Sequence, residues 1–380
     1  MFDRAILHMD MDAFFVSVEI LKDRRLEGKP LVIGGREGRG VVASCSYEAR
    51  RFGIRSAMPM KMALRLCPDL IVRKGDMDTY SKCSKLITEV IQNEAPIFEK
   101  ASIDEFYLDL TGMDRYFGSW KWAKELKDKI VRESGLPISI GLSKNKLVSK
   151  VGVNVDKPRA EKMIPPGAEK AFFAPLSIKV LPQIGAKTYQ KLSFMGVRDI
   201  KTLAAIPQHL LRREFGKPGL TLWKKANTID DSPVVPYTEQ KSIGHERTFQ
   251  QDTIDVRQLK AQLSKMVTQL GFELRHKGKL ASVVTVKLRY TDFNTYSKQR
   301  RISYTASDRT ILHHVHELFD KLYERRQLVR LVGVKLSGLT SGYYQVHLFE
   351  DTEKDVKLLN TMDRIRKRYG SQAVKPASNL

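Results

Sequence analysis

Short hydrophobic runs and amphipathic helix patterns alternate along the first 164 residues. Residues 97–110 are expected to form two strands around a tight connection at 102–105. Helices interleaved with strands favour a mostly antiparallel sheet that is backed by helices. Further runs predict strands at 5–10, 31–33, 41–44 and 138–142. Residues at steps of three and four mark two helices: Tyr80, Cys83, Ile87 and Val90 in one, and Trp122, Leu126 and Ile130 in the other.

The pattern changes at Pro165-Pro166-Gly167, which predicts a domain boundary. Residues 167–230 are expected to form short helices separated by Gly and Pro. The segment from Asp230 to Pro236 combines charged residues with prolines and is expected to be a linker.

Residues 241–340 predict a separate unit of two helices and several strands. Hydrophobic and polar positions alternate over 281–290, so one face of that strand should be buried and the other wet. The segment carries 19 Lys+Arg against 9 Asp+Glu, which favours a surface for a nucleic-acid backbone over an ordinary solubilising face. Basic residues of the wet face are Lys287, Arg289, Arg301 and Lys335. The hydrophobic face of the first predicted helix consists of Leu259, Leu263, Met266, Leu270 and Leu274. That of the second consists of Leu312, Val315, Phe319 and Leu322.

The charge of the whole chain supports the same class of partner. Its 380 residues carry 66 Lys+Arg and 43 Asp+Glu, a formal net charge of +23, which predicts a polyanionic partner. The length predicts two to four domains. No run of about 18 apolar residues occurs, and charges come too early for a signal peptide. Nucleic acid is therefore favoured over membrane, and a cytoplasmic location is expected. The alternative is a generally basic soluble protein.

Two pairs of acidic residues stand at predicted strand ends. Asp10 and Asp12 follow the first strand, and Asp104 and Glu105 lie in the connection at 102–105. A sheet can hold such carboxylates together, and Mg²⁺ prefers their hard oxygens. Two ions about 3.5–4 Å apart can serve an in-line phosphoryl transfer. Taken alone, each pair is explained equally well by turn or cap residues.

Five segments, in this order and spacing, carry a family resemblance. They are HMDMDAFFVSVE (8–19), YEARRFGIRSAMP (47–59), ASIDEFYLDLTG (101–112), GLSKNKLVSK followed by DKP (141–158), and KSIGHERTF (241–249). Over roughly residues 1–350 the chain resembles the Y-family DNA polymerases, which carry out translesion synthesis, and most of all their bacterial DNA polymerase IV group.

The resemblance implies an α+β multidomain fold of the right-hand polymerase type. The palm would hold a helix-backed antiparallel sheet, the fingers would be small, and the thumb would be helical. A C-terminal little-finger domain of four strands and two helices would bind DNA. In chain order the parts would be 1–10 and 77–164 for the palm, 11–76 for the fingers, 165–230 for the thumb, 231–240 for a linker, 241–340 for the little finger and 341–380 for a tail with a charged helix.

The resemblance also implies roles for individual residues. Asp10, Asp104 and Glu105 would be catalytic and, with the backbone carbonyl of Met11, would bind two Mg²⁺ ions. Phe14 and Phe15 would contact the sugar of the incoming nucleotide, and the Phe15 ring would exclude a ribose 2′-hydroxyl by steric clash. Contacts to the triphosphate would come from Tyr47, Arg50 and Lys157. Contacts to DNA would come from Gly185, Lys241, Arg247, Lys287, Arg289, Arg301 and Lys335.

The segment LPQIGAKTYQKLSFMGV (181–197) resembles a helix-hairpin-helix, in which backbone N–H groups of the turn face a DNA phosphate. Gly185 is retained, but Gln183 stands where the family has Gly, which predicts a weaker phosphate contact. Asn154 and Ala160 also depart from the Asp and Gly that are usual in the family, which affects the geometry near Lys157.

The segment QVHLF (345–349) resembles the short peptide by which bacterial polymerases dock on the sliding clamp. Leu348 and Phe349 would fill an apolar pocket, and Gln345 would make polar contacts. Such tethering raises the effective concentration of the enzyme at the primer end. The alternative is that both hydrophobic residues pack on their own domain.

The leading hypothesis is a monomeric, template-directed DNA polymerase of the low-fidelity, lesion-bypass type. A primer 3′-hydroxyl would attack the α-phosphate of a deoxynucleoside triphosphate and release pyrophosphate. A two-metal nuclease or nucleotidyl cyclase is disfavoured by Phe15, Tyr47, Arg50 and Lys157, since a nuclease needs neither triphosphate contacts nor a sugar gate. A catalytically inactive DNA-binding module is disfavoured by the three intact carboxylates.

Overall fold

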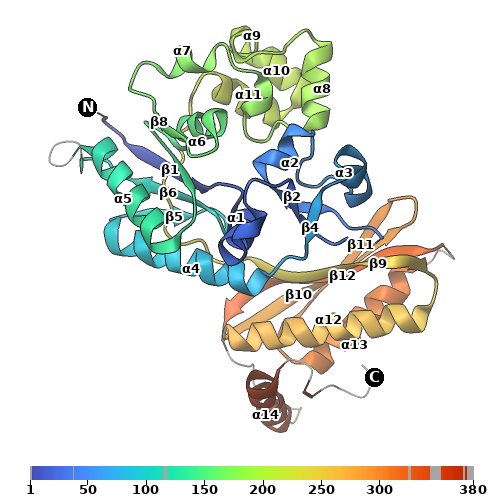
Figure 1. The fold of residues 1–380 in the computed structure, drawn as a ribbon. Helices are drawn as coiled ribbons and strands as arrows, with labels where there is room; N and C mark the ends of the chain where they lie inside the picture. The colour runs from blue at the N-terminus through green and yellow to red at the C-terminus, as the bar shows by residue number, and fades with distance from the viewer. Residues whose placement is uncertain are drawn as a thin grey trace. The chain divides into compact units, whose positions relative to one another are not determined.

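The computed structural model describes residues 2–36, 38–113, 118–323, 327–342, 352–370 and 373–374. The chain divides into two compact units, Met1–Thr238 and Glu239–Leu380, whose elements are labelled in Figure 1. Each unit is described by itself below.

The central sheet of the first unit has five strands in the order β5-β6-β1-β7-β8. Strand β1 (Ile6–Met11) lies in the middle and runs antiparallel to β6 (Glu105–Asp109) and β7 (Ile138–Ser143). The edges are β5 (Phe98–Lys100) and β8 (Glu161–Met163), and β8 pairs with β7 in parallel. The predicted strands and the mostly antiparallel sheet are confirmed.

Helices cover both faces of this sheet, which explains why all six residues of β1 are buried. One hydrophobic core joins β1, β6 and β7 to α1 (Phe14–Lys22), α4 (Met77–Glu94) and α5 (Ser119–Ser134). Helix α6 (Lys146–Asp156) packs on β1 and β7, where the Ser149 hydroxyl donates to the Ile6 carbonyl. A Cβ at Gly141 would lie 2.5 Å from the Ser149 carbonyl oxygen, so glycine permits this close approach.

A small sheet in the order β3-β2-β4 lies in the segment expected to form the fingers. It consists of β2 (Leu31–Gly34), β3 (Val42–Cys45) and β4 (Ile71–Arg73), which share a core with α2 (Tyr47–Arg51) and α3 (Met60–Leu66). A short 3₁₀ helix, η1 (Arg24–Leu26), follows α1. Ser46 caps α2 by accepting from the Ala49 N–H, which fixes the start of the helix that carries Tyr47 and Arg50.

The segment expected to form the thumb is helical, as predicted. Its core also includes Leu147, Val148 and Val151 of α6, so α6 and the helices of this segment share one hydrophobic cluster. The elements are α7 (Glu169–Phe173), η3 (Ile178–Val180), α8 (Ala186–Phe194), α9 (Ile200–Ala205), α10 (Gln208–Phe215) and α11 (Lys217–Ala226).

The expected linker is bound to the first unit along part of its length. Asp230 accepts from the Leu147 N–H at 3.0 Å, and the Val235 N–H donates to Glu99 at 2.7 Å. Val234 is buried beside Ile6. Hydrophobic burial and satisfied backbone groups hold this segment where composition alone suggested a free connection.

The second unit is a four-stranded antiparallel sheet in the order β11-β10-β12-β9. Two helices, α12 (Val256–His276) and α13 (Asp308–Leu322), pack on it and form its core, as the helix faces predicted. The strands are β9 (Ser242–Thr253), β10 (Lys279–Tyr290), β11 (Thr295–Thr305) and β12 (Val329–Ser341). The predicted charged helix is also present as α14 (Thr352–Tyr369), and Arg275 of α12 donates to its Asp363 at 2.6 Å.

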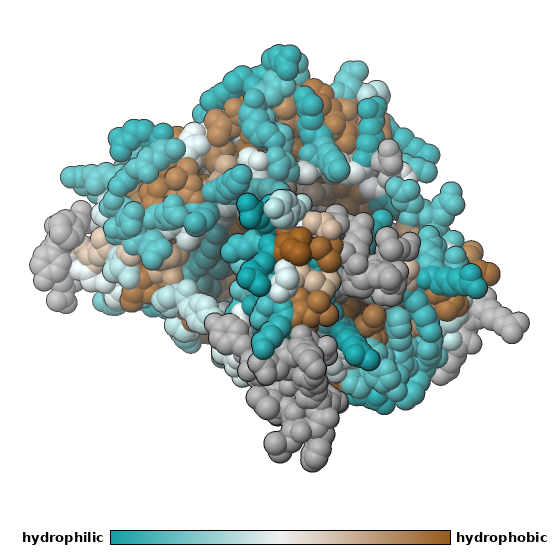
Figure 2. All heavy atoms as spheres, turned by 90° about the horizontal axis from the view of Figure 1, so that it is seen from below, coloured by the Kyte–Doolittle hydropathy of each residue, from teal (hydrophilic) through white to brown (hydrophobic). Residues whose placement is uncertain are grey.

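Polar residues dominate the surface. Figure 2 shows a face on which hydrophilic residues surround separate hydrophobic areas, as the high content of charged residues implies. Within the described residues, no helix combines the length and apolar character needed to cross a bilayer.

Candidate active site

Strand pairing brings the two predicted carboxylate motifs together. Asp10 near the end of β1 stands opposite Glu105 at the start of β6 in the antiparallel register. Residues in direct register project their side chains to the same face, so the two carboxylates meet above adjacent strands. One carboxylate oxygen of Asp10, one of Glu105 and one ring nitrogen of His8 all lie within 4.8 Å of one another. Asp10, Asp104 and Glu105 are together called the carboxylate cluster below.

The connection before β6 is fixed by Ser102. Its hydroxyl accepts from the Asp104 and Glu105 N–H groups at 3.2 and 3.0 Å and donates to the Asp104 carboxylate at 2.5 Å. The Met11 N–H donates to the Asp104 carbonyl at 3.1 Å, which ties this turn to β1. The tight connection expected at 102–105 therefore holds Asp104 beside the cavity that Asp10 also lines.

Two lysines of the α6 region pair with these carboxylates. Lys157, directly after α6, forms an ion pair with Asp10, and Lys150 lies 2.5 Å from Glu105. Burial raises the pKa of Asp10 to about 7, and Lys157 acts in the opposite direction. His8 and Lys150 hold the pKa of Glu105 well below its usual range. Lysine charge therefore compensates much of the negative charge of the cluster.

His8 lies beneath the cluster and is completely buried. Burial lowers its pKa to about 4, so the ring is neutral at physiological pH. Its Nε2 is 4.0 Å from Glu105. Because the His8 ring is neutral, the charge of the site comes from the carboxylates and the lysines.

A cavity of about 230 Å³ opens beside the carboxylates. It brings together seven residues that the sequence assigned to metal, sugar or triphosphate: Asp10, Met11, Phe14, Phe15, Arg50, Asp104 and Lys157. Ala13, Ala43, Ser44 and Ser56 complete its lining. Glu105 and Tyr47 do not belong to the lining of this cavity.

The Phe15 ring has a rigid backing. It stacks on Tyr80 with ring centroids 4.4 Å apart and planes inclined by 12°. Tyr80 is itself buried, and its hydroxyl donates to Glu19 at 2.8 Å. Phe15 therefore has little freedom to move away from a bulky sugar.

Asp12 organises the other side of the site. It is buried and accepts from the Ser139 hydroxyl at 2.8 Å, the Arg159 N–H at 2.7 Å and the Tyr47 hydroxyl at 3.2 Å. The Arg50 guanidinium lies 4.4 Å from the centre of the Tyr47 ring. Asp12 thus fixes the two helix residues expected to contact the triphosphate, which agrees with its omission from the expected metal ligands.

Known proteins show the same arrangement of segments. Residues 9–154 match the impB/mucB/samB family, and residues 240–348 match the C-terminal domain of that family. A DNA polymerase IV of Dehalococcoides mccartyi strain CBDB1 is 37% identical over 375 residues, which cover 98% of this chain and 96% of that protein. The chain belongs to the Y-family of DNA polymerases.

Other relatives agree with this membership. DNA polymerase IV of Halorhodospira halophila is 39% identical over 353 residues, covering 91% of this chain and 98% of that one. A solved Y-family DNA polymerase chimera of Dbh and Dpo4 has a TM-score of 0.79 and 26% identity, covering 89% of this chain and all of that chain. This Y-family polymerase is thus a DNA-directed DNA polymerase of the lesion-bypass kind, with the right-hand α+β fold expected from its sequence.

The carboxylate cluster of this Y-family polymerase fits divalent metal ions. Asp10, Asp104 and Glu105 offer hard oxygen donors at one end of a rigid sheet, as Mg²⁺ requires. A second group of possible ligands, His313, His314 and Glu317, lies on α13 and has a single carboxylate, which is paired with Arg300. The first group offers more carboxylate oxygens and lies beside a cavity, so it is the better metal site.

Three supporting residues were missed by sequence reasoning. Lys150 precedes Lys157 by seven residues, about two helical turns, and this spacing could have revealed it. Ser139 and Tyr80 gave no such signal, because each acts on a residue far away in the sequence.

In the segment expected to form a helix-hairpin-helix, Gly185 is the N-cap of α8, without a side-chain cap. Gln183, where the family has Gly, adopts a left-handed backbone with φ of 74°. Its side chain and the Pro182 carbonyl accept from Lys225 at 2.7 and 2.9 Å. Gln in place of Gly at position 183 therefore gives the turn a residue with a strained backbone, and Lys225 lies beside it.

Gln183→Gly is expected to stabilise the protein by about 1 kcal/mol, because glycine adopts this backbone without strain. Denaturant unfolding of the purified variant measures the change. The control is Gln190→Gly inside α8, which should destabilise by about 1 kcal/mol. Equal destabilisation by both substitutions would contradict the strain at residue 183.

The basic face of the second unit is largely as expected. Lys287 and Arg289 of β10 share a sheet face with Arg301 and Lys335, since Arg301 pairs with Val283 and Lys335 with Thr285. Lys241 is exposed just before β9. Arg247 pairs with Val332, whose side chain faces the helices, and donates to Gln262 of α12 at 3.2 Å. Arg247 therefore lies on the opposite face from this basic row.

The clamp-like peptide with Gln345, Leu348 and Phe349 lies outside the described residues. Its role remains a prediction from the sequence.

Proposed function

We propose that this polymerase extends a DNA primer with Asp10, Asp104 and Glu105 as ligands of two Mg²⁺ ions and the Met11 carbonyl as a further ligand. Bound there, the ions would lower the barrier to attack by the primer 3′-oxygen and stabilise the departing pyrophosphate. The observation that carries the proposal is the direct register of Asp10 and Glu105 beside the cavity that also holds Asp104.

Residues of the chain would orient the nucleotide in this cavity. Arg50 and Lys157 supply cationic donors to the phosphates, and Tyr47 supplies a hydroxyl at the same side. Lys157 is paired with Asp10 in this structure. Binding of a phosphate would therefore replace the Asp10 carboxylate as its anionic partner. Phe14 and Phe15 line the part of the cavity where the sugar would lie. Primer extension with purified protein, primed template and the four deoxynucleoside triphosphates tests the whole assignment, and failure to extend would reject it.

The basic row Lys287, Arg289, Arg301 and Lys335 is proposed to follow the DNA backbone, with Lys241 and Gly185 as further contacts. Each phosphate contact contributes about 0.9 to the slope of log affinity against log salt. Replacing the four row residues with Gln is therefore expected to reduce that slope by about three to four. Fluorescence anisotropy over a salt series measures it. Arg247→Gln, on the opposite face, is the control and should leave the slope within about one unit.

The clamp peptide is proposed to dock on a sliding clamp through Leu348 and Phe349, with Gln345 making polar contacts. Replacing both hydrophobic residues with Ala is expected to abolish stimulation by the clamp while extension without clamp stays unchanged. Extension on a circular primed template, with and without loaded clamp, measures both. Stimulation that survives the double substitution would disprove the assignment. A monomeric state and a cytoplasmic location complete the proposal.

A further inference from the structure

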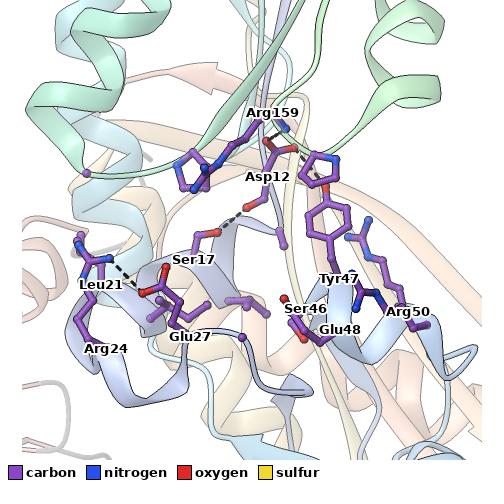
Figure 3. Close-up of a pocket in the computed structure, with 18 residues that line it drawn as sticks. Asp12, Ser17, Leu21, Arg24, Glu27, Ser46, Tyr47, Glu48, Arg50 and Arg159 are labelled. Carbon is purple, nitrogen blue, oxygen red and sulfur yellow. Dashed lines mark hydrogen bonds and ion pairs between the residues drawn. The ribbon is translucent and has the colours of Figure 1, made fainter.

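A second, larger cavity lies within the first unit on the other side of Asp12 (Figure 3). Its volume is about 690 Å³. One wall is formed by Val16, Ile20 and Leu21 of α1, and the opposite wall is α2. Ala13 and Arg50 line this cavity and also the active-site cavity, so the two spaces adjoin at these residues.

The boundary between the two cavities is made of the groups that hold Asp12. The Tyr47 hydroxyl and the Arg159 N–H donate to opposite oxygens of this carboxylate, as Figure 3 shows. Arg50 lies against the Tyr47 ring. Two of the three side chains proposed to contact the triphosphate therefore stand at the entrance to the second cavity.

The lining of the second cavity includes the acidic residues Asp12, Glu27 and Glu48, but also two arginines whose side chains have no acidic partner among the described residues. Arg51 and Arg159 line it and are exposed, and neither has an acidic partner in the described part of the chain. Arg24, in the same wall, is paired with Glu27 at 3.9 Å. With Arg50, which lines both cavities, these two guanidinium groups supply phosphate-binding donors in the wall of the second cavity.

We propose that the pyrophosphate product leaves through this second cavity, with Arg51 and Arg159 receiving it from Arg50. The inference rests on the proposed function. When the primer 3′-oxygen bonds to the α-phosphorus, the bond from that phosphorus to the bridging oxygen breaks, and pyrophosphate keeps the electron pair. This polyanion is held by Arg50 and Lys157 and needs successive cationic donors to depart. The same route admits pyrophosphate for the reverse reaction.

Arg51→Gln/Arg159→Gln tests this route, because both side chains are exposed and their replacement leaves the core intact. Pyrophosphate release, followed by stopped flow with pyrophosphatase and a fluorescent phosphate sensor, is expected to slow about tenfold. In the reverse reaction, the pyrophosphate concentration giving half-maximal primer shortening should rise about tenfold. Single-turnover incorporation, which precedes release, should stay within about twofold of wild type.

Glu48→Gln is the matched variant of opposite charge, since Glu48 lines the same cavity. It should lower the half-maximal pyrophosphate concentration, because a repelling carboxylate is removed. The inference is overturned if the double variant releases pyrophosphate at the wild-type rate, or if incorporation slows in parallel with release. Absence of incorporation by the wild type would instead reject the proposed function.

Discussion

Asp104→Ala is expected to slow primer extension by about a thousandfold or more. Loss of one ligand would remove several kcal/mol of transition-state stabilisation at the reacting phosphate, and about 4 kcal/mol corresponds to that factor. The fold should survive, because Asp104 is only partly buried and its turn keeps the backbone bonds to Met11 and Ser102. Single-turnover extension at saturating nucleotide measures the change.

Two controls separate lost chemistry from lost structure. Asp109→Ala changes the same residue type at the far end of β6 and should leave extension close to that of wild type. DNA affinity of the Asp104 variant should also be retained. If Asp104→Ala extends primers at more than about a tenth of the wild-type rate, Asp104 is not a metal ligand.

Phe15→Ala is expected to increase the use of ribonucleotides by about tenfold to a hundredfold relative to deoxyribonucleotides. A 2′-hydroxyl forced against the ring corresponds to an overlap of about 1–3 kcal/mol, and each 1.4 kcal/mol is about tenfold. The Phe15 ring cannot move away from the sugar, because it stacks on buried Tyr80. The ratio of kcat/KM for the two sugars, measured on one template, reports the change.

Phe15→Tyr keeps the ring and is expected to keep the discrimination. Tyr80→Leu removes the backing of the ring and should relax discrimination partly while leaving Phe15 in place. An unchanged sugar preference in Phe15→Ala would show that another group reads the sugar.

The local pattern of the sequence predicted most elements of both units. Alternation in β10 placed Lys287 and Arg289 on the wet face, and the structure agrees. The same rule could have placed Arg247, since it shares parity with Ile243 and Phe249, both of which are buried. The acidic motifs were found in the sequence, and the register of β1 with β6 brings Asp10 and Glu105 together as expected.

Contacts between distant segments were beyond the reach of the sequence. Tyr80 was predicted as a core helix residue, and it is buried, but its stacking on Phe15 depends on how α4 packs against α1. Composition suggested a linker, yet hydrogen bonds to Leu147 and Glu99 and the burial of Val234 hold this segment. Such contacts depend on tertiary packing, which neither periodicity nor composition encodes.

Asp12 accepts hydrogen bonds from three segments that lie far apart in the chain, at Tyr47, Ser139 and Arg159. Arg159 donates through its backbone N–H, so most substitutions there keep this bond. A change at Tyr47 or Ser139 removes a side-chain donor from a buried carboxylate, so the effect of either change on nucleotide use depends on whether the other donor is intact. Random variants selected for altered nucleotide preference should therefore include substitutions at Tyr47 and Ser139. The effects of changing both residues together should be far from additive, because a carboxylate that has already moved is little affected by the loss of a second donor.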